Sequence, residues 1–156
     1  MEVPVKAIAA SAVVLKEAQG ELQLLLMKRA EQDGNFWAHV TGGIEAGETA
    51  WQTALREINE EAGISIEALY SGEFIEQFYD ARNNRIMLVP VFVAYAKPGA
   101  EVVLSEEHSD YRWCNLAEAK ALAPFIGLHK VYEHVWQHFV LAQPHEILKI
   151  PFAHAS

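Results

Sequence analysis

Three things are scarce in this chain of 156 residues, and each scarcity excludes a class of protein. A single cysteine, Cys114, rules out an intrachain disulfide and suits a reducing compartment such as the cytoplasm. No apolar run approaches the roughly 20 residues of a membrane-spanning helix, and the apolar stretch 7–15 follows Glu2 and only one basic residue, unlike a signal peptide. Basic residues number 12 against 21 acidic ones, which argues against extended nucleic-acid binding.

The remaining composition predicts one globular domain over residues 1–156. Hydrophobic residues make up 51% and charged residues 21%, so the chain can bury a core. The formal net charge is −9, and the carboxylates are unevenly spread. One segment, 42–64, has a single cation, Arg56, and holds Glu45, Glu48, Glu57, Glu60 and Glu61. What this acidic segment binds is therefore the first functional question.

Hydrophobic periodicity predicts an α/β domain around this segment. Strands are expected at 6–15 and 22–28 as an antiparallel pair, then at 37–41, 69–80, 86–96 and 111–115. Pro90 favours an edge position or a bulge for the strand at 86–96. Helices are expected at 116–122 and 128–141. A further helix begins at the T-x-x-Q capping box of Thr49 and Gln52 and ends at Gly63.

Three carboxylates stand on one edge of that helix, because Glu57, Glu60 and Glu61 are spaced i, i+3 and i+4. Like charges at this spacing destabilise a helix, and the last turn disfavours anions further. Two interpretations remain open on spacing alone. The edge is a solvated acidic face, or it binds a hard divalent cation, Mg²⁺ or Mn²⁺, through oxygen ligands.

The whole segment resembles the signature of the Nudix hydrolase family, G-x5-E-x7-R-E-U-x-E-E-x-G-U, in which U is a bulky aliphatic residue. Every specified position is matched: Gly42, Glu48, Arg56, Glu57, Ile58, Glu60, Glu61, Gly63 and Ile64. The resemblance implies a Nudix α/β/α sandwich, a mixed β-sheet between helices with the signature as a loop–helix–loop. It also implies hydrolysis of a phosphoric anhydride by water attack on phosphorus.

The resemblance assigns roles residue by residue. It makes Glu57, Glu60 and Glu61 catalytic ligands of Mg²⁺ or Mn²⁺, and Glu48 and Arg56 residues that hold the segment together. Gly42 and Gly43 let the backbone turn tightly into the site, next to the substrate. Downstream, the run E-H-x-x-x-x-W beginning at Glu107 resembles a family loop that supplies a base or a further ligand, so Glu107 is the fourth catalytic candidate.

The substrate is less well specified. The patterns F-W-x-x-V-T-G and E-H-x-x-Y-R-W resemble the branch that hydrolyses dihydroneopterin triphosphate and dATP to a monophosphate and pyrophosphate. In that interpretation Arg29 contacts phosphates, while Trp37 or Phe36 stacks on a flat heterocycle. Diadenosine polyphosphate hydrolysis is the alternative, supported by Tyr79 and weakened by Thr41, where such enzymes tend to have proline. A non-catalytic nucleotide sensor is the alternative of another class. The partner is a small nucleotide or pterin polyphosphate, and the oligomeric state, homodimer included, stays open.

Overall fold

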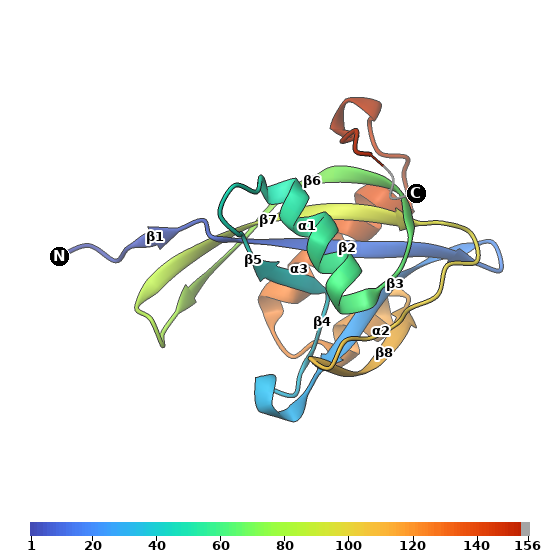
Figure 1. The fold of residues 1–156 in the computed structure, drawn as a ribbon. Helices are drawn as coiled ribbons and strands as arrows, with labels where there is room; N and C mark the ends of the chain where they lie inside the picture. The colour runs from blue at the N-terminus through green and yellow to red at the C-terminus, as the bar shows by residue number, and fades with distance from the viewer. Residues whose placement is uncertain (154–156) are drawn as a thin grey trace.

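The computed structural model describes residues 1–153 and has one mixed β-sheet at its centre (Figure 1). The strands are β1 (Val5–Lys6), β2 (Ala9–Ala18), β3 (Glu21–Arg29), β4 (Trp37–Ala38), β5 (Val40–Gly43), β6 (Ile66–Asp80), β7 (Arg85–Ala96) and β8 (His108–Cys114). β2 and β3 form the expected antiparallel pair, and β2 also pairs in parallel with β7. Five of the six expected strands are present within a few residues of their predicted bounds, whereas the strand expected at 37–41 is divided into β4, which pairs with β3, and β5, which pairs with β2.

The surroundings of Pro90 correct the edge prediction, whereas a β-bulge, the other alternative, does lie in β6 opposite the neighbouring Val91 and Phe92. β7 is an interior strand, because β6 pairs along one side of it and β1 and β2 pair along the other. On that second side β1 pairs up to Met87 and β2 begins at Val91. Pro90 therefore lies between the two partner strands on that side, and it pairs with Ile75 of β6 on the other.

Helices cover both faces of the sheet, as the sandwich requires. α1 (Ala50–Glu57) lies on one face, and α2 (Leu116–Leu122) and α3 (Ile126–Val135) lie on the other (Figure 1). Alternate residues of β2 divide between two cores: Ala12 and Val14 pack toward α1, while Val13 and Leu15 pack toward α3. The β6–β7 hairpin extends past the helices at one end of the molecule (Figure 1). None of the helices described is long and apolar enough to cross a bilayer.

The helix of the acidic segment begins as the sequence predicts. Thr49 accepts a hydrogen bond from the Gln52 N–H, and the Gln52 side chain accepts one from the Thr49 N–H. α1 then passes into a π-helical turn, Ile58–Ala62, and ends at Gly63 with φ of 57°. A π turn rotates the residues after it relative to an α-helix, so sequence spacing alone does not fix where the last glutamates point. Similarly, α3 is followed by a π turn at Trp136–Val140 within the predicted helix 128–141.

Candidate active site

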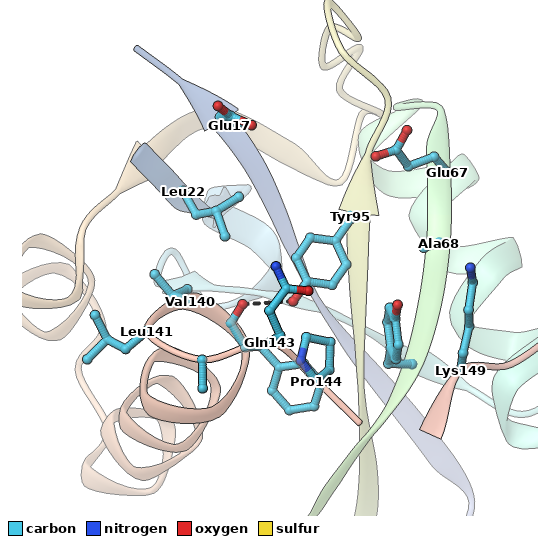
Figure 2. A pocket seen from close by; sticks show the side chains of 13 residues that line it. Glu17, Leu22, Glu67, Ala68, Tyr95, Val140, Leu141, Gln143, Pro144 and Lys149 are labelled. Carbon is cyan, nitrogen blue, oxygen red and sulfur yellow. Dashed lines mark hydrogen bonds between the residues drawn. The ribbon is translucent and has the colours of Figure 1, made fainter. Parts of the chain in front are cut away.

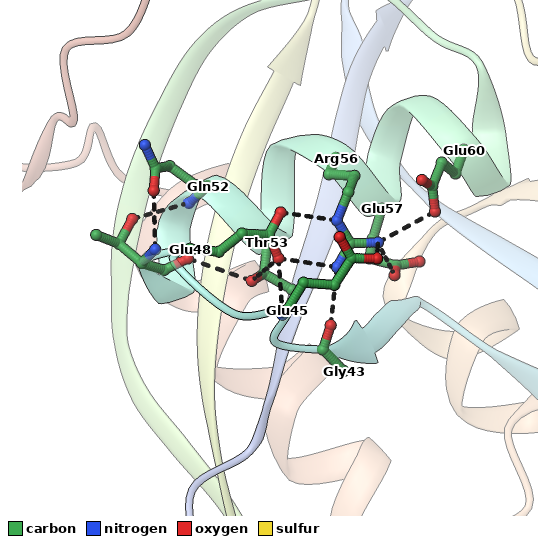
Figure 3. Close-up of polar contacts among 9 residues, drawn as sticks. Gly43, Glu45, Glu48, Gln52, Thr53, Arg56, Glu57 and Glu60 are labelled. Atoms are coloured by element: carbon green, nitrogen blue, oxygen red, sulfur yellow. Dashed lines mark hydrogen bonds and ion pairs between the residues drawn. The ribbon is translucent and has the colours of Figure 1, made fainter.

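Arg56 is the centre of the acidic segment (Figure 3). Its Nε and Nη2 donate to the two Glu48 carboxylate oxygens at 2.7 and 3.0 Å, and Nη2 also donates to the Gly43 carbonyl at 2.8 Å. Its Nη1 donates to Glu57 at 2.6 Å and to Glu60 at 3.1 Å. The bidentate bond from Arg56 lowers the pKa of the Glu48 carboxyl to about 2. One guanidinium thus ties the loop before α1 to the last turn of that helix.

Glycine at position 42 allows Glu57 to lie against the end of β5. β2 fixes Gly42 through its pairing with Ala10. A Cβ at Gly42 would be 2.2 Å from Glu57 Cδ and 2.3 Å from its Oε1, so no larger residue fits beside this carboxylate. The same atom added at Gly43 would meet only the Ile8 carbonyl at 4.0 Å. Gly42 is therefore a steric requirement of the site.

Glu61 is the buried carboxyl of the site, with a side chain only 4% exposed. His108 Nε2 lies 3.6 Å from its Oε1, and its Oε2 has no hydrogen-bond partner among residues 1–153. Burial and the neighbouring Glu57 raise the pKa of Glu61 to about 9, and Arg29 opposes this shift. Arg56 compensates Glu57, whereas the buried Glu61 carboxyl beside it keeps one oxygen without a donor among residues 1–153.

The donor set suits a hard divalent cation, because such ions take carboxylate oxygens and would compensate this charge. Glu57 and Glu61 face one another, and Glu107 lies close enough to raise the Glu61 pKa further. Glu60 differs from its two neighbours: its side chain is 55% exposed and bonded to Arg56. No group of three His, Cys, Asp or Glu side chains within the described part of the chain is already arranged to hold a metal ion.

Two of the predicted substrate-binding residues, Arg29 and Trp37, differ in their relation to this centre. Arg29 ends β3 and is near enough to influence Glu61 and His108, and its guanidinium lies 5.1 Å from the Phe36 ring centroid. Trp37 is half-buried in the α3-side core, with Arg112 5.8 Å from its ring centroid. Arg29 is therefore placed beside the carboxylates, whereas Trp37 mainly contributes packing.

Two side chains of the site were not assigned a role from the sequence. Thr53 is fully buried and donates from Oγ1 to Glu48 at 2.9 Å, so it helps to fix the carboxylate that Arg56 binds. The sequence signal for a role of Thr53 was its position beside the apolar residues of the helix. His108 is buried against Glu61, which sequence could not reveal because β8 reaches α1 only through the tertiary fold.

A large pocket lies away from these residues (Figure 2). It has a volume of about 710 Å³ and is lined by residues that include Glu17, Glu67, Tyr95, Phe139 and Lys149. Tyr95 closes part of its wall by donating from its hydroxyl to the Phe139 carbonyl at 2.7 Å. Its lining residue from β2, Glu17, lies at the end of that strand opposite Ala9–Ala10, the residues that pair with Gly42–Gly43. This pocket is therefore separate from the acidic site.

Comparison with known proteins places this geometry in a family context. Residues 5–147 match the family description "NUDIX domain". The chain is 32% identical over 119 residues to a bis(5'-nucleosyl)-tetraphosphatase of Caenorhabditis elegans, covering 75% of this chain and 85% of that protein. It is 31% identical over 123 residues to dihydroneopterin triphosphate diphosphatase of Escherichia coli, covering 72% and 81%.

A solved Ap4A hydrolase from C. elegans superposes with a TM-score of 0.74 at 26% identity, over 85% of this chain and 96% of that one. An octanoyltransferase of Myxococcus xanthus is also 32% identical over 122 residues, 77% of this chain, but the match spans only 34% of that longer protein.

Proposed function

This chain belongs to the Nudix hydrolase family, and we propose that it is a metal-dependent pyrophosphohydrolase of a nucleoside-triphosphate-like substrate. The substrate is a (d)NTP or dihydroneopterin triphosphate, and the products are the monophosphate and pyrophosphate. The observation that carries the proposal is the buried Glu61 carboxyl, with an oxygen that lacks a hydrogen-bond partner in the described part of the chain, next to Glu57 and its neighbour Gly42. All signature carboxylates are present, which favours a hydrolase over a nucleotide sensor.

A divalent ion, as Nudix hydrolases generally require, would supply charge neutralisation of the phosphates and a bound water of lowered pKa. In this proposal Glu57, Glu60 and Glu61 hold Mg²⁺ or Mn²⁺. Arg56 orients Glu57, and the bond from Arg56 to Gly43 keeps the glycine turn against the helix. Glu107 accepts the proton of the attacking water from its loop next to Glu61. Arg29 offsets part of the charge that phosphate oxygens bring.

Diadenosine tetraphosphate hydrolysis is the second candidate. Relatives of that name match at identities similar to that of the dihydroneopterin enzyme, and Tyr79 is available on β6 for stacking, with an exposed side chain. Thr41 in place of proline counts against it.

Identification of the products decides between these candidates. Purified protein with Mg²⁺ is incubated separately with dNTPs, dihydroneopterin triphosphate and diadenosine tetraphosphate, and the products are identified by mass spectrometry. Monophosphate and pyrophosphate from a triphosphate support the proposal. Efficient formation of ATP and AMP from the dinucleotide alone would select the second candidate, and no turnover of any compound would refute both.

A further inference from the structure

Phe36 and Phe125 form an aromatic step on the protein surface. The two rings contact edge to face, with centroids 5.3 Å apart and an interplanar angle of 72°. Phe36 is half-buried against the α3-side core, whereas Phe125 is 53% exposed. An exposed aromatic ring beside a half-buried one offers a surface on which another flat ring can stack.

Arg29 links this aromatic step to the acidic site. Its guanidinium carbon lies 5.1 Å from the Phe36 ring centroid, and its charge opposes the raised pKa of the buried Glu61 carboxyl. The Arg29 side chain makes no hydrogen bond and no ion pair among residues 1–153. A guanidinium that the fold leaves without an anion, between aromatic rings and a carboxyl site, suits a phosphate group of a ligand.

The backbone fixes the position of both rings. The Phe36 carbonyl accepts the Arg29 N–H at 2.8 Å, so the two residues stay side by side. A Cβ at Gly34 would be 2.8 Å from the Phe36 ring, and glycine there makes room for it. Phe125 is the N-cap of α3, and its carbonyl accepts the Leu128 N–H at 3.0 Å. Rings that are fixed before binding lose little conformational entropy when a ligand stacks on them.

Trp37, the other ring expected from the sequence to stack on substrate, is less available. It is half-buried in the α3-side core, and the Arg112 guanidinium lies 5.8 Å from its ring centroid. Phe125 comes from the connection between α2 and α3, far from Phe36 in the sequence. Only the packing of the start of α3 brings it to the step.

We propose that Phe125 is a substrate-binding residue, on which the heterocycle of the substrate stacks while Arg29 binds its phosphates. Stacking on an aromatic side chain tolerates every nucleobase, because each base has a π face. The aromatic step therefore selects a flat heterocycle over a bare polyphosphate, and it accepts a purine and a pterin alike. This inference rests on the proposed function, since it places the heterocycle of that substrate.

Truncation of Phe125 tests the inference through KM. Phe125→Ala should raise KM for the hydrolysed triphosphate by about 10-fold and keep kcat within about 2-fold, because stacking is lost while no reacting group moves. Phe125→Leu keeps an apolar side chain without a ring and should change KM in the same direction, whereas Phe125→Trp should restore it. Leu141→Ala removes an exposed apolar side chain at the separate pocket and should change neither constant.

Binding without turnover separates this inference from the proposed function. The calorimetric probes are the α,β-methylene analogue of dATP, which is not hydrolysed at that bond, and inorganic tripolyphosphate, which has no ring. Phe125→Ala should weaken binding of the analogue by about 10-fold and leave tripolyphosphate binding unchanged. This result in a protein that hydrolyses nothing would refute the proposed function and keep the inference.

Three results would overturn the inference and leave the proposed function standing in a protein that releases pyrophosphate. The first is a folded Phe125→Ala variant with the wild-type KM. The second is an equal loss of affinity for the analogue and for tripolyphosphate in that variant, which would indicate a structural role only. The third is wild-type protein that binds the analogue no more tightly than tripolyphosphate.

Discussion

Replacement of Gly42 by alanine tests whether the position of Glu57 controls the reaction. The added Cβ would lie 2.2 Å from Glu57 Cδ, whereas ordinary contacts begin at 3.4 Å, so the carboxyl must move back by the difference, about 1.2 Å. That movement also breaks the 2.6 Å bond from Arg56. Displacement of a reacting group by about 1 Å can cost about 100-fold in rate, so kcat/KM should fall by that order.

The fold should tolerate this change. Gly42 has no positive φ, and the obstructing atoms belong to the end of a flexible side chain. The measurements are pyrophosphate release at saturating Mg²⁺ and the thermal midpoint of each variant. Gly127→Ala adds a methyl group with nothing within 4 Å and serves as the control. Gly43→Ala, with its nearest neighbour at 4.0 Å, should reduce the rate much less. A folded Gly42→Ala protein with the wild-type rate would refute the steric argument.

Four further predictions follow from the same geometry. Glu61→Gln should raise the thermal midpoint of the metal-free protein at neutral pH. The fold raises the pKa of Glu61 to about 9, so this carboxyl ionises more readily in the unfolded chain and destabilises the fold as pH rises above the unfolded pKa. An unchanged midpoint would contradict this. Glu60→Gln should abolish pyrophosphate release without unfolding the protein, since Glu60 is exposed; normal rates would remove it from the metal site. Glu48 stabilises the fold above its unfolded pKa and loses this contribution as pH falls toward about 2, so wild type should lose more thermal stability than Glu48→Gln on acidification from about pH 5 to pH 3. Thr49→Ala should cost about 1 kcal/mol in urea unfolding through loss of the N-cap, and an unchanged urea midpoint would show that the cap is not needed.

Local signals proved sufficient for most of the secondary structure. The capping box of Thr49 and Gln52 and the stop at Gly63 fix the helix ends through contacts between near neighbours in sequence. The strand at 86–96 was also correctly predicted, but its place in the sheet was not. An edge position inferred from Pro90 assumes that its strand has a partner on one side only. The second side of β7 is instead occupied first by β1 and then by β2, and both strands lie far away in the sequence.

The same division holds for the site. The sequence by itself determined the chemistry present, because the spacing of Glu48, Arg56 and the three helix glutamates matches one family signature. Only the tertiary structure decided how these groups differ. A π turn and the approach of β8 bury Glu61 against His108, while Glu60 remains exposed on Arg56. Burial sets the energy of a charge, and burial depends on which distant segments pack together, so spacing along the chain cannot determine it.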